Sequence, residues 1–214
     1  MSDIKLVAFD VDGTLIKSDL WVRVNQLFGV SQEKDQELLT RYISGNITYH
    51  EWFALLRDLW RQSGRTKSEL QAILHEFEFT PHAEELVGYL KGKYHLALVS
   101  SGFDLYVSEV AQRLDISHVY FLSKFVFDEE ERFSSIEFEV DLTEVEAKVF
   151  ALKDLQKRYK LEPHEIAFVG DSKNDIGAFE YTGKGILFGE GTTESLRQSA
   201  WKQVDSLNDI KEIL

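Results

Sequence analysis

Three short apolar runs, each ending in small and acidic residues, constrain the fold of this chain more than any other feature. The runs cover residues 6–9, 96–99 and 166–169, and helical patterns separate them. Because they lack polar alternation, they are typical of strands buried on both faces of a sheet. The pattern predicts an α/β fold, a doubly wound parallel sheet with crossover helices. Ligands bind at the carboxyl ends of such strands, so the polar clusters predict one shared site.

A helical stretch follows the first predicted strand. Residues 18–79 contain two capping boxes, Thr48 with Glu51 and Thr66 with Glu69, which are typical of helix starts. Three tryptophans are expected to form the core of this stretch: Trp21, Trp52 and Trp60. We therefore predict a Rossmann-like catalytic core of residues 1–17 and 80–214, interrupted after its first strand by a helical cap of residues 18–79.

Further elements are predicted after the helical stretch. Thr80 followed by Pro81 predicts a helix start, with threonine as the cap and proline at the first helical position. Residues 125–127 and 136–140 predict a β-hairpin whose acidic turn is solvated. Thr143, followed by Glu146, opens another predicted helix.

Composition excludes several classes of protein. The chain has 24 Lys+Arg against 37 Asp+Glu, a formal net charge of −13, which repels nucleic acids and anionic lipids. It has no cysteine, which excludes disulfides, a thiol nucleophile and thiolate zinc sites. No signal-peptide pattern is present, and no apolar run approaches the ~20 residues needed to cross a bilayer. We expect a cytoplasmic protein that binds neither nucleic acid nor membrane; its oligomeric state is left open.

The first polar cluster contains two carboxylates. Asp10 and Asp12 stand two apart at the end of a predicted strand, so both can face one side, and Gly13 lets the backbone turn sharply. Such a pair suits a division of labour in which one carboxylate attacks or binds metal and the other moves protons. A calcium-binding EF-hand loop is excluded, because its glycine would be sixth and a glutamate twelfth, where this chain has Trp21.

The second cluster follows residues 96–99. Ser100, Ser101 and Gly102 offer hydroxyls and backbone N–H groups ahead of a predicted helix, an arrangement that can hold phosphate. By itself this sequence is more typical of an ordinary turn, and only the other clusters favour a phosphate site.

The third cluster holds a second carboxylate pair. Asp171 and Asp175 follow residues 166–169 and could complete a hard-cation site with Asp10. The alternative is a helix N-terminus, where aspartate is a favoured cap. Lys148 lies on the preceding predicted helix, beside apolar residues that indicate partial burial.

Together these clusters resemble the four motifs of the haloacid dehalogenase superfamily of phosphohydrolases. Their order and spacing match: residues 9–15, then Ser100, then Lys148, then Asp171 with Asp175. Helices placed directly after the first motif resemble the helical cap of that superfamily. The hairpin and the sequence of residues 100–104 are most similar to phosphoserine phosphatases and their relatives.

The resemblance implies a role for each motif. Asp10 would attack phosphorus and form an aspartyl-phosphate. Asp12 would protonate the departing alkoxide and then take a proton from the hydrolytic water. Ser100 and Lys148 would hold the phosphoryl oxygens, since phosphoryl transfer depends mainly on positioning and on neutralising charge.

The resemblance also implies Mg²⁺ as the cofactor. Its ligands would be the carboxylates of Asp10 and Asp171 and the backbone carbonyl of Asp12. Asp175 is predicted to belong to the same metal site, where it would orient Lys148 or waters on the metal. So many carboxylates would repel an anionic substrate unless a divalent ion offset them, so no useful activity is expected without Mg²⁺.

Substrate binding is assigned on the same resemblance. Ser101, Gly102 and Asn174 are predicted to hydrogen-bond the phosphate or the leaving group. In the cap, Asp19 and Arg57 are predicted to recognise an amino acid. Asp19 stands at the acidic position after the first motif, and Arg57 is adjacent to the position counted for an arginine.

We therefore predict an Mg²⁺-dependent phosphatase acting on a small phosphorylated metabolite and similar to phosphoserine phosphatases. Two alternatives lie within the superfamily: a phosphotransferase, and a sugar-phosphate phosphatase of the methionine-salvage type. A non-catalytic regulator that accepts phosphate on aspartate is the alternative from another class. The position of Asp12 beside Asp10 favours turnover over a stable phosphorylated state.

Overall fold

The computed structural model describes residues 3–17, 20–139 and 142–214. The chain divides into two compact units. The first is formed by residues 1–18, 78–122 and 139–214, and the second by residues 19–77 and 123–138. The second unit thus includes the predicted hairpin as well as the helical stretch, and its role as a cap stays a prediction.

The first unit is built on a six-stranded sheet in the order β3-β2-β1-β6-β7-β8. Its strands are β1 (Leu6–Phe9), β2 (His95–Val99), β3 (His118–Tyr120), β6 (Ile166–Gly170), β7 (Gly185–Phe188) and β8 (Lys202–Val204). Every neighbouring pair is parallel, and β1 lies between β2 and β6, with Ala8 opposite Ala97 and Phe168. The predicted doubly wound parallel sheet is confirmed.

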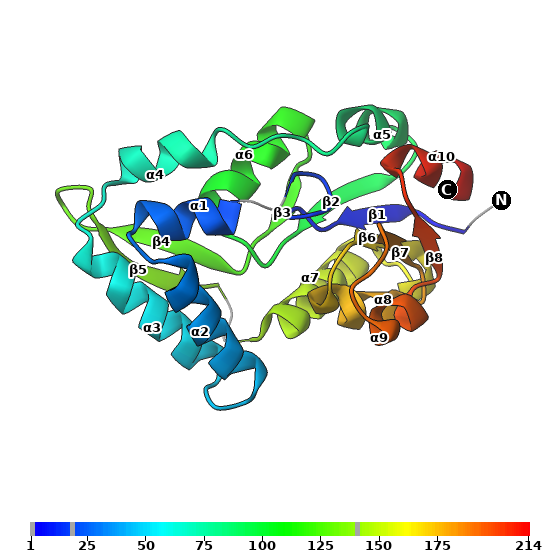
Figure 1. The fold of residues 1–214 in the computed structure, drawn as a ribbon. Helices are drawn as coiled ribbons and strands as arrows, with labels where there is room; N and C mark the ends of the chain where they lie inside the picture. The colour runs from blue at the N-terminus through cyan, green and yellow to red at the C-terminus, as the bar shows by residue number, and fades with distance from the viewer. Residues whose placement is uncertain (1–2, 18–19, 140–141) are drawn as a thin grey trace. The chain divides into compact units, whose positions relative to one another are not determined.

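Helices cover both faces of this sheet. Figure 1 shows α7 (Glu144–Tyr159), α8 (Ile176–Thr182) and α9 (Glu194–Ser199) on one face, and α5 (Ala83–Leu90), α6 (Asp104–Leu114) and α10 (Ile210–Ile213) on the other. An apolar cluster lies under α7 and α8, with Leu152, Leu155 and Phe179 packed with Ala8 and Phe168. Burial of both sheet faces explains why the central strands read as continuous apolar runs.

The helix predicted to open at Thr80 and Pro81 is present as α5, but it begins at Ala83, so the predicted cap and first helical position are wrong. The N–H of Thr80 donates to the carbonyl of Leu15 at 2.9 Å, so the segment is tied to the loop after β1. His82 then adopts a left-handed φ of 70°, and α5 begins at Ala83 without a side-chain cap.

The second unit combines helices with the hairpin. Its helices are α1 (Leu20–Leu27), α2 (Gln32–Ile43), α3 (Tyr49–Gln62) and α4 (Lys67–Leu74), and its antiparallel strands are β4 (Ser123–Phe127) and β5 (Phe133–Phe138). The predicted capping boxes begin α3 and α4. The hairpin is confirmed, with Val140 outside the described residues. In its exposed turn, Asp128 accepts hydrogen bonds from the N–H groups of Glu130 and Arg132.

Aromatic side chains form the core of the second unit. Trp60 is fully buried and stacks on Phe28, with ring centroids 4.9 Å apart. Phe133 of the hairpin lies edge-on to both rings. Trp52 is buried as well, and Trp21 is half-buried 5.5 Å from it, so all three predicted core tryptophans pack together. In the part of the chain that the structure describes, no helix is long and apolar enough to cross a lipid bilayer.

Candidate active site

The site begins where β1 ends. Asp10 is buried, and its N–H donates to the carbonyl of Val169 on β6 at 2.8 Å. The chain then turns at Gly13, which has a φ of +76° and whose missing Cβ would overlap the carboxylate of Asp171. The next residue, Thr14, donates its hydroxyl to Asp171 Oδ1 at 3.2 Å. Glycine is therefore required here both by the backbone angle and by the close approach of the two loops.

The loop after β6 is organised around Asp175. This side chain is fully buried, and its Oδ2 accepts hydrogen bonds from the N–H groups of Asp171 and Ser172, each at 3.0 Å. A Cβ on Gly170 would overlap the same carboxylate. The alternative prediction, a cap at a helix start, is also partly met, because Ser172 and Asp175 form a capping box for the 3₁₀ turn Lys173–Asp175.

Lys148 joins these two loops from α7. Its side chain is buried, and its Nζ lies 3.1 Å from Asp10 Oδ1, 2.6 Å from Asp175 Oδ1 and 2.8 Å from Asn174 Oδ1. The predicted capping box of Thr143 and Glu146 is present and starts this helix. Lys148 thus lies just beyond the capped first turn, which places its ammonium among the carboxylates.

Three carboxylates gather at this edge of the sheet. Asp10, Asp171 and Asp175 each offer one oxygen, and these oxygens lie within 4.8 Å of one another. Hard oxygen donors in this number suit a hard divalent cation such as Mg²⁺. Lys148 contributes one positive charge against three negative charges, so the donor set also fits a divalent cation by charge.

Burial and charge shift the acid–base behaviour of the site. The pKa of Asp10 is raised well above its ordinary value, first by burial and then, despite Lys148, by the carboxylates of Asp175 and Asp171. Burial and the charge of Asp175 raise the pKa of Asp171 to about 6. Burial alone would lower the pKa of Lys148, but Asp10 and Asp175 raise it overall, so this side chain stays an ammonium.

Asp12 is not one of the three clustered carboxylates, although its charge acts on Asp10 and Asp171. Its Oδ2 accepts a hydrogen bond from the hydroxyl of Tyr106 on α6. Burial raises the pKa of Asp12 to about 6, although the Tyr106 bond and Lys148 lower it. A carboxyl with that pKa can both donate and accept a proton near neutral pH.

The predicted phosphate-binding residues lie beside this cluster. Ser100 is buried, and its Oγ accepts a hydrogen bond from the N–H of Gly102 at 2.9 Å. Asn174 donates to Ser101 Oγ and to Glu144 Oε2, both at 3.1 Å. The structure therefore joins the second and fourth motifs through Asn174.

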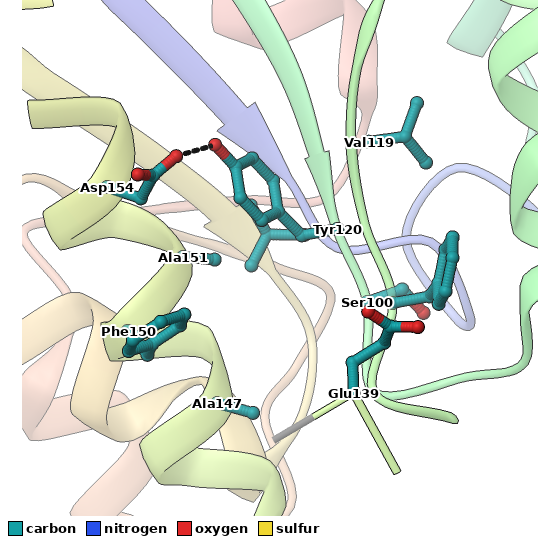
Figure 2. A pocket seen from close by; sticks show the side chains of 10 residues that line it. Ser100, Val119, Tyr120, Glu139, Ala147, Phe150, Ala151 and Asp154 are labelled. Carbon is teal, nitrogen blue, oxygen red and sulfur yellow. Dashed lines mark hydrogen bonds between the residues drawn. The ribbon is translucent and has the colours of Figure 1, made fainter. Parts of the chain in front are cut away.

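A cavity adjoins Ser100. It has a volume of about 400 Å³ and lies between the carboxyl ends of β2 and β3 and one face of α7. Figure 2 shows the small side chains Ala147 and Ala151 lining it, with Tyr120 directed at Asp154. The hydroxyl of Tyr120 donates to Asp154 Oδ2 at 2.5 Å.

The predicted substrate residues Asp19 and Arg57 belong to the second unit. Asp19 lies outside the described residues. Arg57 lies on α3, where its guanidinium pairs with the neighbouring Asp58 at 3.1 Å. Leu56, which occupies the position counted for an arginine, is fully buried. Recognition of a substrate by Asp19 and Arg57 stays a prediction.

Two residues of the site were not singled out from the sequence. Thr14 holds Asp171, and Tyr106 holds Asp12. The buried face of α6 is otherwise apolar, so from the sequence a tyrosine there is interpreted as a core residue. Its hydroxyl was the available signal, because a buried tyrosine O–H usually finds a hydrogen-bond partner.

Fold and site together define a class of α/β enzyme that gathers a buried acid cluster and a lysine at the carboxyl ends of parallel strands. The chain belongs to the haloacid dehalogenase-like hydrolase family, whose model matches residues 4–183, and it is therefore a hydrolase. The resemblance seen in the four motifs is thus confirmed.

Similar proteins include named phosphatases. A phosphoserine phosphatase of Methanocaldococcus jannaschii is 25% identical over 86% of this chain and 85% of its own length. A phosphoglycolate phosphatase of Haemophilus influenzae is 28% identical over 91% of each chain. The solved structure of a phospho-aspartyl intermediate analogue of phosphoserine phosphatase has the same fold, with a TM-score of 0.80, 24% identity and 99% coverage of both chains.

Proposed function

We propose that this protein is an Mg²⁺-dependent phosphatase that hydrolyses a small phosphomonoester through an aspartyl-phosphate. One observation carries the proposal: Asp10, Asp171 and Asp175 present oxygens within 4.8 Å of one another, and the Lys148 ammonium lies 3.1 Å from Asp10. Family membership and the named phosphatases among similar proteins support it. A cytoplasmic location stays a prediction.

In the first step Asp10 attacks phosphorus. The bond from its carboxylate oxygen to phosphorus forms as the bond to the leaving oxygen breaks, and Asp12 gives its proton to that oxygen. In the second step Asp12 takes a proton from water, which attacks phosphorus and releases Asp10 and inorganic phosphate. Lys148 and Ser100 hold the phosphoryl oxygens in both steps, and Lys148 also offsets their charge.

The acid cluster would hold the cation. Asp10 and Asp171 would be its carboxylate ligands, together with the backbone carbonyl of Asp12. When bound, Mg²⁺ supplies positive charge to the transferring phosphoryl group and to the carboxylate that attacks it. Asp175 already accepts two backbone N–H groups and Lys148, so its main task is to hold Lys148 and the loop in place.

Phosphoserine and phosphoglycolate are the first substrates to compare, because both activities are named among the similar proteins. Both carry a carboxylate, which Arg57 would bind, but only phosphoserine carries an amine, which Asp19 would bind. Preference for phosphoserine would therefore support both predicted contacts, and preference for phosphoglycolate would support Arg57 alone.

The test is a panel of small phosphoesters with Mg²⁺ and with chelator, using wild type and Asp10→Asn. We expect phosphate release that requires Mg²⁺ and falls by about 10³-fold or more in Asp10→Asn, as for loss of a nucleophile. Full activity in chelator or in Asp10→Asn would overturn the proposal. A phosphorylated acceptor among the products would indicate a phosphotransferase, and a phosphorylated Asp10 that persists for hours would indicate a regulator.

A further inference from the structure

Tyr106 connects α6 to the loop after β1. Its side chain is buried, and its hydroxyl donates a hydrogen bond to Asp12 Oδ2, although the two residues are 94 positions apart in the chain. Nothing in the four motifs calls for a tyrosine at this position. The contact therefore ties the proposed acid to a helix outside the motifs.

The start of the phosphate-binding loop is shaped around this hydroxyl. A Cβ on Gly102 would overlap the hydroxyl of Tyr106, so glycine is required for the tyrosine to reach Asp12. The N–H of Gly102 is in turn held by Ser100 Oγ at 2.9 Å. A single arrangement thus places Ser100, Gly102 and the hydroxyl of Tyr106 side by side.

We propose that Tyr106 is a positioning residue that orients Asp12 for proton transfer to the leaving group. By engaging Oδ2, it directs the other oxygen of Asp12, Oδ1, toward the leaving oxygen of the substrate. The proton passes from Oδ1 to the leaving oxygen as the phosphorus–oxygen bond breaks, and its electron pair stays on that oxygen. Tyr106 keeps its own proton throughout. This inference rests on the phosphatase function proposed above.

A role through Asp12 predicts a dependence on the leaving group. An alkyl phosphate releases an alkoxide that needs a proton, whereas p-nitrophenyl phosphate releases an anion that is stable without one. A misdirected acid therefore slows the first reaction and spares the second. Since kcat/KM reports the steps up to transfer of phosphate to Asp10, it isolates this proton transfer from the later hydrolysis.

The test is Tyr106→Phe, which removes the hydroxyl and keeps the ring. We expect kcat/KM for the best alkyl phosphate of the panel to fall about 10- to 100-fold, within the range of general acid catalysis. For p-nitrophenyl phosphate we expect a change of less than about 3-fold, because the acid is not needed there. Circular dichroism and thermal denaturation establish that each variant is folded at the assay temperature.

Tyr120→Phe is the matched control. Tyr120 also donates its hydroxyl to an aspartate, Asp154 of α7, in the same unit of the protein (Figure 2). Because this hydroxyl contacts Asp154 and not Asp12, its loss should produce no leaving-group effect: any change in kcat/KM should be the same for both substrates. Gly102→Ala is a second variant, because its Cβ displaces the hydroxyl of Tyr106 without removing it. Gly102 is itself a predicted phosphate-binding residue, so both substrates should lose activity, and the loss should be larger with the alkyl phosphate than with p-nitrophenyl phosphate.

A double-mutant cycle shows whether Tyr106 acts through Asp12. In an Asp12→Asn background, Tyr106→Phe should cause no further loss with the alkyl phosphate, because the group that it orients is gone. Equal losses with both substrates, no loss with either, or full additivity with Asp12→Asn would overturn the inference. If wild type hydrolysed no phosphomonoester, or if Asp10→Asn stayed active, the proposed function itself would have failed instead.

Discussion

Asp171 is a single residue whose negative charge is unfavourable in its buried position. Its pKa is raised to about 6 by burial and by the charge of Asp175. A folded-state pKa above the ordinary value means that the stability from this group is present at low pH and is lost as the pH rises through about 6. In chelator we therefore expect Asp171→Asn to be more stable than wild type by about 1–3 kcal/mol near pH 7.5, with no gain near pH 4.

Urea unfolding in chelator at several pH values measures this difference. Asp205→Asn, at an exposed position, is the control and should show no such trend. Adding Mg²⁺ at neutral pH should stabilise wild type and should have little effect on Asp171→Asn, because the variant lacks a ligand. A gain in stability that does not change with pH would contradict the role of this carboxylate.

For single residues, the sequence predicted the charged side chains of the site better than the residues that hydrogen-bond to them. Asp10, Lys148 and Asp171 were predictable because motif spacing and strand ends bring them to one edge of the sheet. Tyr106 was not, because a buried aromatic residue at helical spacing is normally core, and only the fold brings its hydroxyl to Asp12.

Helix α7, which carries Lys148, and α8, which follows Asp175, approach each other closely because one of them has a glycine at the contact. Gly177 on α8 faces α7, where a Cβ would lie 2.6 Å from Val145 Cγ1 and 3.2 Å from Val149 Cγ2. Glycine-to-alanine changes inside helices normally stabilise, but overpacking costs about 1–3 kcal/mol. We expect Gly177→Ala to lower the free energy of unfolding by about 1–2 kcal/mol and to lower activity, because the neighbouring turn carries Lys148.

Gly88→Ala provides the opposite case for this prediction. Gly88 lies on α5 with nothing within 4 Å of a Cβ, so alanine should stabilise by about 0.5–1 kcal/mol. Thermal denaturation compares the two variants, and Val145→Ala added to Gly177→Ala should recover part of the loss. Stabilisation by Gly177→Ala alone would show that α7 and α8 do not approach as described.

Helix starts were predictable where their signal is local. The three capping boxes are present because threonine and glutamate three residues apart satisfy each other's backbone groups without help from the rest of the fold. The start of α5 was mispredicted because it depends on the distant carbonyl of Leu15, which binds the N–H of Thr80. A hydrogen bond between residues far apart in the sequence leaves no local pattern from which it could be predicted.

The division of the whole molecule depends on contacts between distant segments. Residues 123–138 lie between the core strands β3 and β6 in the sequence, yet the structure groups them with the helices of residues 19–77. Phe133 and Phe125 of the hairpin lie 5.9 Å and 6.0 Å from Trp60, measured between ring centroids. Side-chain partners of this kind cannot be read from periodicity, so the sequence predicted the hairpin but not the unit to which it belongs.

Phe133→Ala tests this division. The side chain is buried against Phe28, Trp60 and Phe125, so its loss should lower the free energy of unfolding of the second unit by about 3–5 kcal/mol. Three of the four tryptophans lie in that unit, and their emission should shift to longer wavelength at lower urea than in wild type.

The first unit should respond differently to the same change. The acid cluster lies wholly within the first unit. In Phe133→Ala, Mg²⁺ should therefore still raise the urea concentration at which the circular dichroism signal of the first unit is lost. Phe150→Ala, at a phenylalanine that is 51% exposed on α7, should change stability by less than about 0.5 kcal/mol. Equal effects of Phe133→Ala and Phe150→Ala on tryptophan emission would refute the placement of the hairpin, since a core residue and a surface residue would then be indistinguishable.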